Sequence, residues 1–504
     1  MSLQTIFSRW QVQLASALTL ALVLRLLGIF SRPIWYDEAF SILFARQGFA
    51  AMLSGTISQT AGVAADVHPL GYYLLLSGWM TVFGDSLFAA RLFSVVPGLG
   101  LVVLAYFLAR HLWGARLGWI AALLIACAPF QIHYAQEIRM YVWMTLWLIL
   151  ACYAYWRAHA GTQAWWLLFA FSAALAQYTQ HLSGVFLVSL AFYPLLRRDW
   201  RTAGRVFLAG LGALLLYLPW LIYLPAQLAK VQTSYWIEPP GFERLFTTLL
   251  SFVTNLPIPN DWLAPALFIT LLLTSLAVWQ TLGAKQSSSL GVWAMYMAFM
   301  PAILLYLLSQ WTPIFIERAL LPSGFMFYIW LAWAFWRAGS SQTLRWLAAG
   351  LFLVAASIGL GQHLEYRNFP YAPFEQMDAL MRKNSQAGDV IVHSSKLTAL
   401  PAIYFDSDLP HRYIADYPGG GTDTLALATQ KTLGWLASSD LEIATKGASR
   451  VWLVIFARSE QEAQDAGLTR HPHLTWMLSH YQLQETYQMD EVFIYLYSKA
   501  ATVP

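Results

Sequence analysis

Long apolar runs separated by short polar turns dominate the first 361 residues. A run of about 20 residues is long enough to cross the hydrocarbon core of a bilayer as an α-helix. The pattern therefore predicts a polytopic α-helical membrane protein with about eleven transmembrane helices. The runs lie near residues 12–30, 88–109, 117–130, 140–156, 164–178, 182–196, 204–223, 262–282, 289–310, 319–336 and 346–361.

A further apolar run, from Pro69 to Phe83, is too short to assign by length, so charge must decide it. If this run only lies in the interface, every basic loop shares the side of Arg9, as the positive-inside rule favours. The N-terminus is then cytoplasmic and the C-terminus outside. Residues 31–87 become a first external loop with interfacial helices, and residues 224–261 a second large one. The deciding residues are Arg110, Arg116, Arg157, Arg197, Arg198, Arg201, Arg205, Lys285, Arg337 and Arg345.

Composition agrees with a membrane protein. Of the 504 residues, 58% are hydrophobic and 11% charged, and the mean hydropathy of +0.51 excludes an ordinary soluble protein. The net charge of +4 reflects basic cytoplasmic loops and gives no case for nucleic acid. Cys127 and Cys152 lie inside apolar runs and predict no disulfide framework. No small-residue cleavage site follows the first run, which we interpret as a retained span.

The pattern changes after about residue 362, where charged residues become frequent and apolar runs shorten. Asp389–His393 and Arg450–Phe456 have the length and composition of strands, and a closing hairpin is expected near residues 488–497. We predict a transmembrane catalytic domain over residues 1–361 and an extracytoplasmic α/β domain over residues 362–504. We find no repeat with a period of 20–50 residues.

Acidic residues before residue 362 are few and one-sided. In the predicted topology all of them except Asp199 lie on the outer face. An ionised carboxylate beside hydrocarbon is costly, so this asymmetry predicts a polar site at that face. The ten acids are Asp37, Glu38, Asp66, Asp85, Glu137, Asp199, Glu238, Glu243, Asp261 and Glu317.

Two of the polar clusters on this face lie in the first external loop. Asp37 and Glu38 directly follow the first apolar run. They either take part in catalysis or only stabilise the N-terminus of an interfacial helix. In the second case the helix dipole favours their negative charge and Asp37 caps the helix. Asp66 and His68 precede the short apolar run, where a lone histidine is either functional or part of an ordinary interface.

Two further clusters carry arginine beside acid. Glu137 and Arg139 stand at the outer end of a span, where they bind substrate or only pair with each other or with lipid headgroups. Arg318 follows Glu317, and Arg91 heads the second span. A guanidinium suits a phosphate because of its planar fork, but at a span boundary it also snorkels to water without any function.

Four motifs follow one another over residues 35–141. They are Trp35-Tyr36-Asp37-Glu38-Ala39-Phe40-Ser41, His68-Pro69-Leu70-Gly71-Tyr72-Tyr73, Arg91-Leu92-Phe93-Ser94 and Tyr134-Ala135-Gln136-Glu137-Ile138-Arg139-Met140-Tyr141. Their order and spacing resemble the polytopic GT-C glycosyltransferases related to protein O-mannosyltransferases and aminoarabinose transferases. The similarity continues weakly through Gln180-His181 and Glu317-Arg318. Residues 224–261, with Tyr235-Trp236-Ile237-Glu238-Pro239-Pro240, resemble the family's loop over the lipid donor or equally an ordinary interface loop.

The resemblance implies an inverting transferase that moves a sugar from a polyprenyl-phosphate donor to a hydroxyl of a lipid, glycan or protein. It places the reaction at the outer face of the plasma membrane, the inner membrane of a two-membrane cell. The family's first-loop acid corresponds to Asp37, the expected general base on the acceptor hydroxyl. Glu38 and Glu137 would orient the acceptor or support the base, and Asp66 and Tyr141 would assist.

The departing polyprenyl phosphate needs fixed positive charge or a metal. Arg139 is the first candidate, followed by His68, Arg91 and Arg318. The family often has lysine where this chain has His68, and a second proline where it has Leu70, so a full charge at residue 68 is not assured. Some relatives resemble metal-assisted enzymes, and a divalent metal stays open here, although we find no His/Cys cluster or firm carboxylate cage.

Two rival functions follow from the same sequence. A transporter or flippase for a lipid-linked sugar would use acids inside its spans and internal repeats, whereas here the acids gather at one mouth. A non-catalytic scaffold would explain the C-terminal domain but not the outward polar clusters. Transfer that survives deletion of residues 362–504 would make that domain accessory.

Overall fold

The computed structural model describes residues 10–234, 237–283, 288–337, 340–366, 369–416 and 424–499. The chain divides into two compact units. The first comprises Met1–Phe30, Val67–Gln232 and Ile237–Glu365, and the second comprises Ser31–Asp66, Thr233–Trp236 and Tyr366–Pro504.

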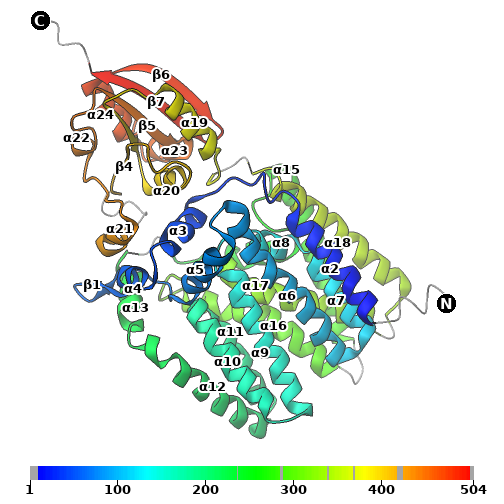
Figure 1. Cartoon of the computed structure of the whole chain (residues 1–504). Helices are drawn as coiled ribbons and strands as arrows, with labels where there is room; N and C mark the ends of the chain where they lie inside the picture. The colour runs from blue at the N-terminus through cyan, green and yellow to red at the C-terminus, as the bar shows by residue number, and fades with distance from the viewer. Residues whose placement is uncertain are drawn as a thin grey trace, which may run out of the picture. The chain divides into compact units, whose positions relative to one another are not determined.

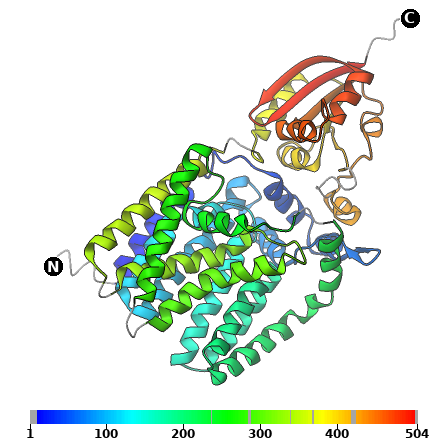
Figure 2. The same ribbon diagram turned by 180° about the vertical axis from the view of Figure 1, so that it is seen from behind.

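The first unit is a bundle of long apolar helices that run side by side (Figures 1 and 2). Each apolar run predicted to cross the membrane is helical over most of its described residues. These helices are α2 (Trp10–Leu26), α6 (Leu87–Trp113), α7 (Ala115–Cys127), α9 (Tyr141–Ala160), α10 (Ala164–Thr179), α11 (Ser183–Leu196), α12 (Trp200–Leu221), α15 (Asn260–Leu282), α16 (Ser288–Leu308), α17 (Leu321–Trp336) and α18 (Gln342–His363).

Six helical stretches among the described residues are long and apolar enough to cross a membrane by themselves. A seventh is obtained if α7 and the short α8 (Pro129–Ala135) count as one broken span. The protein is therefore a multi-span helical membrane protein, as the sequence predicts. The six are Leu87–Trp113, Trp200–Leu221, Asn260–Leu282, Ser289–Leu308, Glu317–Trp336 and Gln342–His363.

Burial separates a central helix from peripheral ones. Every residue of α17 from Leu321 to Phe335 is buried, and the helix packs against α7, α8, α9, α16 and α18. A helix that is apolar on all sides belongs in such a core. In contrast α12 exposes Leu211, Leu214, Leu215 and Leu218, which suits contact with lipid tails.

Short helices occupy the segments between the long ones. They are α5 (Gly71–Phe83), α8, α13 (Leu224–Ser234), α14 (Glu243–Thr254) and the 3₁₀ turn η1 (Glu317–Leu320). With 13 residues, α5 is about 20 Å long, too short to cross the hydrocarbon core. The predicted run 117–130 is not one straight helix, because the chain bends by 63° between α7 and α8. Pro129 begins α8, where its missing N–H is not needed.

The second unit contains a five-stranded mixed sheet with the order β4-β3-β5-β7-β6. β3 pairs in parallel with β4 and β5, while β7 pairs antiparallel with β5 and β6. The two predicted strands and the closing hairpin are confirmed, and the hairpin forms one edge of the sheet (Figures 1 and 2). The strands are β3 (Asp389–His393), β4 (His411–Tyr413), β5 (Arg450–Phe456), β6 (Tyr481–Met489) and β7 (Val492–Lys499).

Helices accompany this sheet, as expected for an α/β unit. Side chains from β3 and β5, including Val390, Val392 and Leu453, share a hydrophobic cluster with Leu474 and Met477 of α24. The helices are α19 (Phe374–Asn384), α20 (Lys396–Phe405), α21 (Leu427–Leu433), α22 (Leu441–Ala444), α23 (Ala457–Asp465) and α24 (Pro472–His480).

The second unit also includes the first part of the predicted external loop. This part forms α3 (Tyr36–Ala45), α4 (Phe49–Ile57) and the two-residue strands β1 (Gln59–Thr60) and β2 (Val63–Ala64). α3 packs against α20 and α4 against α21. The predicted domain boundary between residues 361 and 362 stays a prediction, but the compact units differ from it in grouping residues 31–66 with the C-terminal residues.

Candidate functional site

In the first unit, the motif from Tyr134 to Tyr141 begins in α8, just after the break between α7 and α8. Arg25 of α2 is fully buried, and its guanidinium donates to the carbonyls of Ala126 at 3.1 Å and Ile125 at 3.3 Å. The last carbonyls of a helix lack internal partners and carry partial negative charge, so a cation satisfies both needs. Arg25 therefore fixes the end of α7 and the start of the bend.

Gln136 fastens the other side of the bend. Its Nε2 donates to the carbonyls of Arg25 at 2.9 Å and Leu27 at 2.8 Å, which terminate α2. The side chain is completely buried. Because both amide hydrogens meet carbonyl oxygens, the orientation of the amide is determined, and Oε1 must face the remaining partner.

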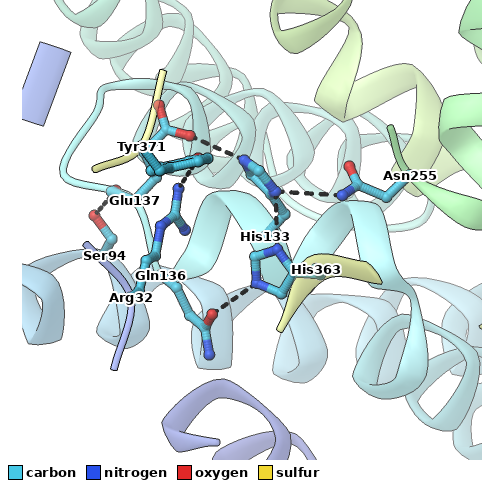
Figure 3. Close-up of polar contacts among 8 residues, drawn as sticks. All are labelled: Arg32, Ser94, His133, Gln136, Glu137, Asn255, His363 and Tyr371. Carbon is cyan, nitrogen blue, oxygen red and sulfur yellow. Dashed lines mark hydrogen bonds and ion pairs between the residues drawn. The ribbon is translucent and has the colours of Figure 1, made fainter. Parts of the chain in front are cut away.

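Glu137 lies at the centre of the motif and is buried, with 2% of its side chain exposed. Ser94 of α6 donates to its backbone carbonyl at 2.6 Å, and His133 Nε2 lies 3.2 Å from its Oε2 (Figure 3). A buried carboxylate is stable only with such polar partners. The geometry holds Glu137 against α6 and α8.

Two histidines extend this contact into a chain (Figure 3). His133 Nδ1 lies 3.0 Å from Nδ1 of His363, which is the last residue of α18. His363 Nε2 lies 2.8 Å from Gln136 Oε1, and Asn255 Nδ2 approaches His133 Nδ1 at 3.2 Å. Glu137, His133, His363 and Gln136 thus form one continuous hydrogen-bonded chain that joins α8, the turn after it and the end of α18.

The three arginines predicted to bind phosphate lie in different parts of the first unit. Arg139 is 4% exposed, two residues beyond Glu137. Arg91 of α6 is fully buried, and its Nη1 donates to the carbonyl of Ile29 at 2.8 Å. Arg318 of η1 lies over the buried ring of Tyr141, 5.2 Å from its centroid. The structure therefore brings Arg318 to Tyr141, and Arg139 to the same turn as Glu137.

The side chain of Gln227 holds the backbone of His68. Gln227 Nε2 donates to the His68 carbonyl at 3.1 Å, and Gln227 Oε1 accepts from Trp220 at 3.1 Å. His181 Nε2 also lies 2.9 Å from Gln227 Oε1. The weak sequence similarity at Gln180-His181 thus marks a residue that supports the His68 segment. Tyr235 and Trp236 of the predicted donor-covering loop lie outside the described residues.

In the second unit, Asp37 and Glu38 occupy the first turn of α3. Glu38 is fully buried, whereas Asp37 is partly exposed. The residue at the N-cap is Trp35, which makes no side-chain cap hydrogen bond, so Asp37 does not cap the helix. Its acidic charge still suits the positive end of the helix dipole. Asp66 is also partly exposed, and its N–H donates to the Thr56 carbonyl at 3.2 Å.

Several residues of this site were not predicted from the sequence. Arg25 had a signal, since a lone arginine inside an apolar run is costly and needs a partner. His133 also had one, because a residue four positions before Glu137 on a helix shares its face. Nothing local marks His363 or Asn255, which come from distant segments. Within the described residues, no group of three or more His, Cys, Asp or Glu side chains could hold a metal ion.

Comparison with known proteins adds a fold and a family match. Residues 67–223 match the model of the dolichyl-phosphate-mannose-protein mannosyltransferase family. The structure resembles that of ArnT from Cupriavidus metallidurans in the apo state, with a TM-score of 0.64, 12% identity and coverage of 96% of this chain and 97% of ArnT. ArnT bound to undecaprenyl phosphate gives a TM-score of 0.62 at 12% identity, over 97% and 98% of the two chains. The chain has the GT-C fold.

An oligosaccharyltransferase from Archaeoglobus fulgidus is more distantly similar, with a TM-score of 0.51 and 13% identity over 97% of this chain and 74% of the other. At the sequence level, an undecaprenyl phosphate-α-4-amino-4-deoxy-L-arabinose arabinosyl transferase of Pseudomonas aeruginosa strain UCBPP-PA14 is 33% identical over 175 residues. That match spans 33% of this chain and 31% of the transferase. The resemblance to polyprenyl-phosphate-sugar glycosyltransferases predicted from the sequence is confirmed.

Proposed function

We propose that this protein is an inverting glycosyltransferase that moves a sugar from a polyprenyl-phosphate donor to a hydroxyl of a lipid, glycan or protein. The family match over residues 67–223 carries the proposal, because this segment contains Glu137 and Arg139 together with His68 and Arg91. The fold supports it, since the similar ArnT was solved with undecaprenyl phosphate.

In the proposed reaction, an acceptor oxygen forms a bond to the anomeric carbon as the bond from that carbon to the phosphate oxygen breaks. Asp37 accepts the proton of the acceptor hydroxyl, which makes the oxygen a better nucleophile. Glu38 and Glu137 orient the acceptor or support the base, and Asp66 and Tyr141 assist. This assignment rests on the resemblance, and it agrees with the partial exposure of Asp37.

The polyprenyl phosphate leaves with an additional negative charge. Arg139 is the main cation that stabilises this charge, and His68, Arg91 and Arg318 contribute. Arginine suits this role, because a guanidinium keeps its charge at any pH at which a protein is folded.

We further propose a topology with eleven spans, a cytoplasmic N-terminus and the C-terminal domain outside the cytoplasm, in the plasma or inner membrane. The helical state of each predicted run supports this count. The motifs at residues 35–41, 68–73 and 134–141 then all lie at the outer face.

The test is transfer by the purified full-length protein in detergent with a set of polyprenyl-phosphate sugars. We expect free polyprenyl phosphate to be released, and Asp37→Asn to abolish release while expression is unchanged. Asp261→Asn, which alters an exposed acid of α15, is the matched control. Full activity of Asp37→Asn would remove Asp37 as the base. Translocation of the intact lipid-linked sugar in proteoliposomes, without covalent transfer, would replace the proposal by a flippase.

A further inference from the structure

Within the second unit, α3 packs against α20. Lys396 is the first residue of α20, and its Nζ lies 5.5 Å from the ring centroid of Tyr36, the first residue of α3. Arg46 directly follows α3, and its Cζ lies 5.2 Å from the ring centroid of Tyr404, near the end of α20. The two cation–π contacts therefore join corresponding ends of two helices about 15 Å long.

Lys396 is an unusual lysine because only 8% of the residue is exposed. Lysine is almost never so buried unless its charge is paired. Here Asp416 Oδ2 lies 3.8 Å from Nζ, while the Tyr36 ring offers its negative face to the same ammonium. The ammonium is thus held between an acid and an aromatic ring, which fixes the place where α20 meets the start of α3.

The neighbouring helix pair is joined as tightly. Thr429 and Thr432 of α21 donate to the carbonyls of Gly55 at 2.9 Å and Ala51 at 3.1 Å in α4. A Cβ at residue 55 would lie 2.6 Å from Thr432 Oγ1, so only glycine permits this approach. The helix that follows α3 is therefore also seated on the C-terminal part of the chain.

The segment before α3 has its own anchor. Arg32 Nη2 donates to Tyr371 Oη at 2.9 Å (Figure 3), and its Cζ lies 5.5 Å from the centroid of that ring and 5.6 Å from the ring of Tyr366. The Trp35 and Tyr371 rings meet edge-on at 6.3 Å. The chain is held before, along and after α3 by residues that follow residue 365.

We propose that the C-terminal part of the second unit positions α3, and with it Asp37 and Glu38, for sugar transfer, with Lys396 as the principal positioning residue. This inference rests on the proposed function. Asp37 directly follows Tyr36, so a shift of the Tyr36 ring moves the base. A displacement of about 1 Å at a reacting group costs on the order of 100-fold in rate. The C-terminal domain is then a working part of the transferase and not an accessory.

The test compares Lys396→Met, which keeps the length of the stem without charge, with Lys396→Arg, which keeps the cation. Lys383→Met, at an exposed position of α19, is the control. In the full-length protein we expect Lys396→Met to lower kcat by about 10- to 100-fold with little change in the KM of the lipid-linked sugar. Lys396→Arg should restore most of kcat. Equal losses in the two variants, or full kcat in Lys396→Met, would overturn the inference.

The ring provides a second pair of variants if Lys396→Met does not fold. Tyr36→Phe keeps the aromatic face and should retain most of kcat, whereas Tyr36→Leu should resemble Lys396→Met. The combination of Tyr36→Leu with Lys396→Met should be no worse than either alone, because both remove one contact. A fully additive loss would mean that the two residues act separately.

A readout independent of turnover separates this inference from the proposed function. Amide hydrogen exchange over residues 36–45 should be faster in Tyr36→Leu than in the unchanged protein and slow in Tyr36→Phe. Unchanged exchange would refute the positioning role even if transfer is found. If exchange changes as expected but no polyprenyl-phosphate sugar is ever cleaved, the proposed function fails and the contact between α20 and α3 stands.

Discussion

The Nδ1 atoms of His133 and His363 face each other at 3.0 Å, although 230 positions separate the two residues in the sequence. A neutral imidazole carries one N–H, so one of these two atoms must donate and the other accept. The ring nitrogens on the far sides are also engaged, His363 with Gln136 and His133 with Glu137. The hydrogens that these three contacts need can therefore be counted, starting from Gln136.

Gln136 Oε1 is an acceptor, because the amide hydrogens of this residue meet two carbonyls. His363 Nε2 must then carry a hydrogen. The contacts between the histidines and between His133 and Glu137 each need one more, which makes three hydrogens for two rings. Two neutral rings supply two, so the third comes either from a second proton on one ring beside an ionised Glu137 or from a protonated Glu137. In both cases these groups together are electrically neutral. Asn255 donates to His133 Nδ1 in the arrangement where His363 is the doubly protonated ring.

Removal of His133 should destabilise the protein through Glu137. His133→Phe leaves a carboxylate with 2% exposure without this partner, so we expect the free energy of unfolding to fall by about 3 kcal/mol. Thermal or denaturant unfolding in detergent measures the loss. His111→Phe, at an exposed histidine of α6, should have little effect. The double variant of His133→Phe with Glu137→Leu should recover part of this loss, because it also removes the buried carboxylate. If it recovers none, the two residues are not coupled.

Much of the fold could be predicted from the sequence, because the spacing of apolar residues and the length of apolar runs determine helices and strands locally. The strands Asp389–His393 and Arg450–Phe456 were predicted with the bounds that the structure shows. The His133–His363 contact and the Lys396–Tyr36 contact could not be predicted, since each joins distant segments and neither motif is distinctive alone. Arg25 lay between these cases: its cost in an apolar run was visible, but its carbonyl partners were not.

The bend between α7 and α8 should depend on the guanidinium of Arg25. Arg25→Met removes the charge-assisted hydrogen bonds to Ala126 and Ile125, so we expect a loss of about 2–4 kcal/mol in the free energy of unfolding. Arg25→Lys should recover only part of this, because an ammonium cannot reproduce the planar fork. Arg116→Met, at an exposed arginine of α7, serves as control. Equal stability of the lysine and methionine variants would show that the fork is not needed.

Stability should vary with pH through Asp378 of α19. Burial raises the pKa of this carboxyl to about 8, with a further increase from Asp406 and an opposing effect of Arg382. The unfolded chain ionises Asp378 near pH 4, so its stabilising effect is complete below that pH and is lost as pH rises towards 8. The slope is about 1.4 kcal/mol per pH unit at most.

Asp378→Asn removes this ionisation and should flatten the profile. Neither carboxyl oxygen has a hydrogen-bond partner among the described residues, so an amide replaces it without breaking a contact. We expect the variant to gain stability relative to the unchanged protein between pH 6 and pH 8, as measured by hydrogen exchange over residues 374–384. The same slope in both proteins would show that another group dominates.

The base and the phosphate-binding arginine should be separable by product inhibition. Free polyprenyl phosphate carries the charge that Arg139 is proposed to stabilise, so Arg139→Met should weaken its inhibition of transfer by about 10- to 100-fold. Asp37→Asn lacks the proposed base but keeps the proposed phosphate site, so the affinity for polyprenyl phosphate, measured by direct binding, should be unchanged or higher. Arg244→Met, at an exposed arginine paired with Glu317 at 2.7 Å, should leave binding intact. Arg139 would lose its assigned role if its variant bound polyprenyl phosphate normally, since a buried arginine that only supports the fold would alter stability and not affinity.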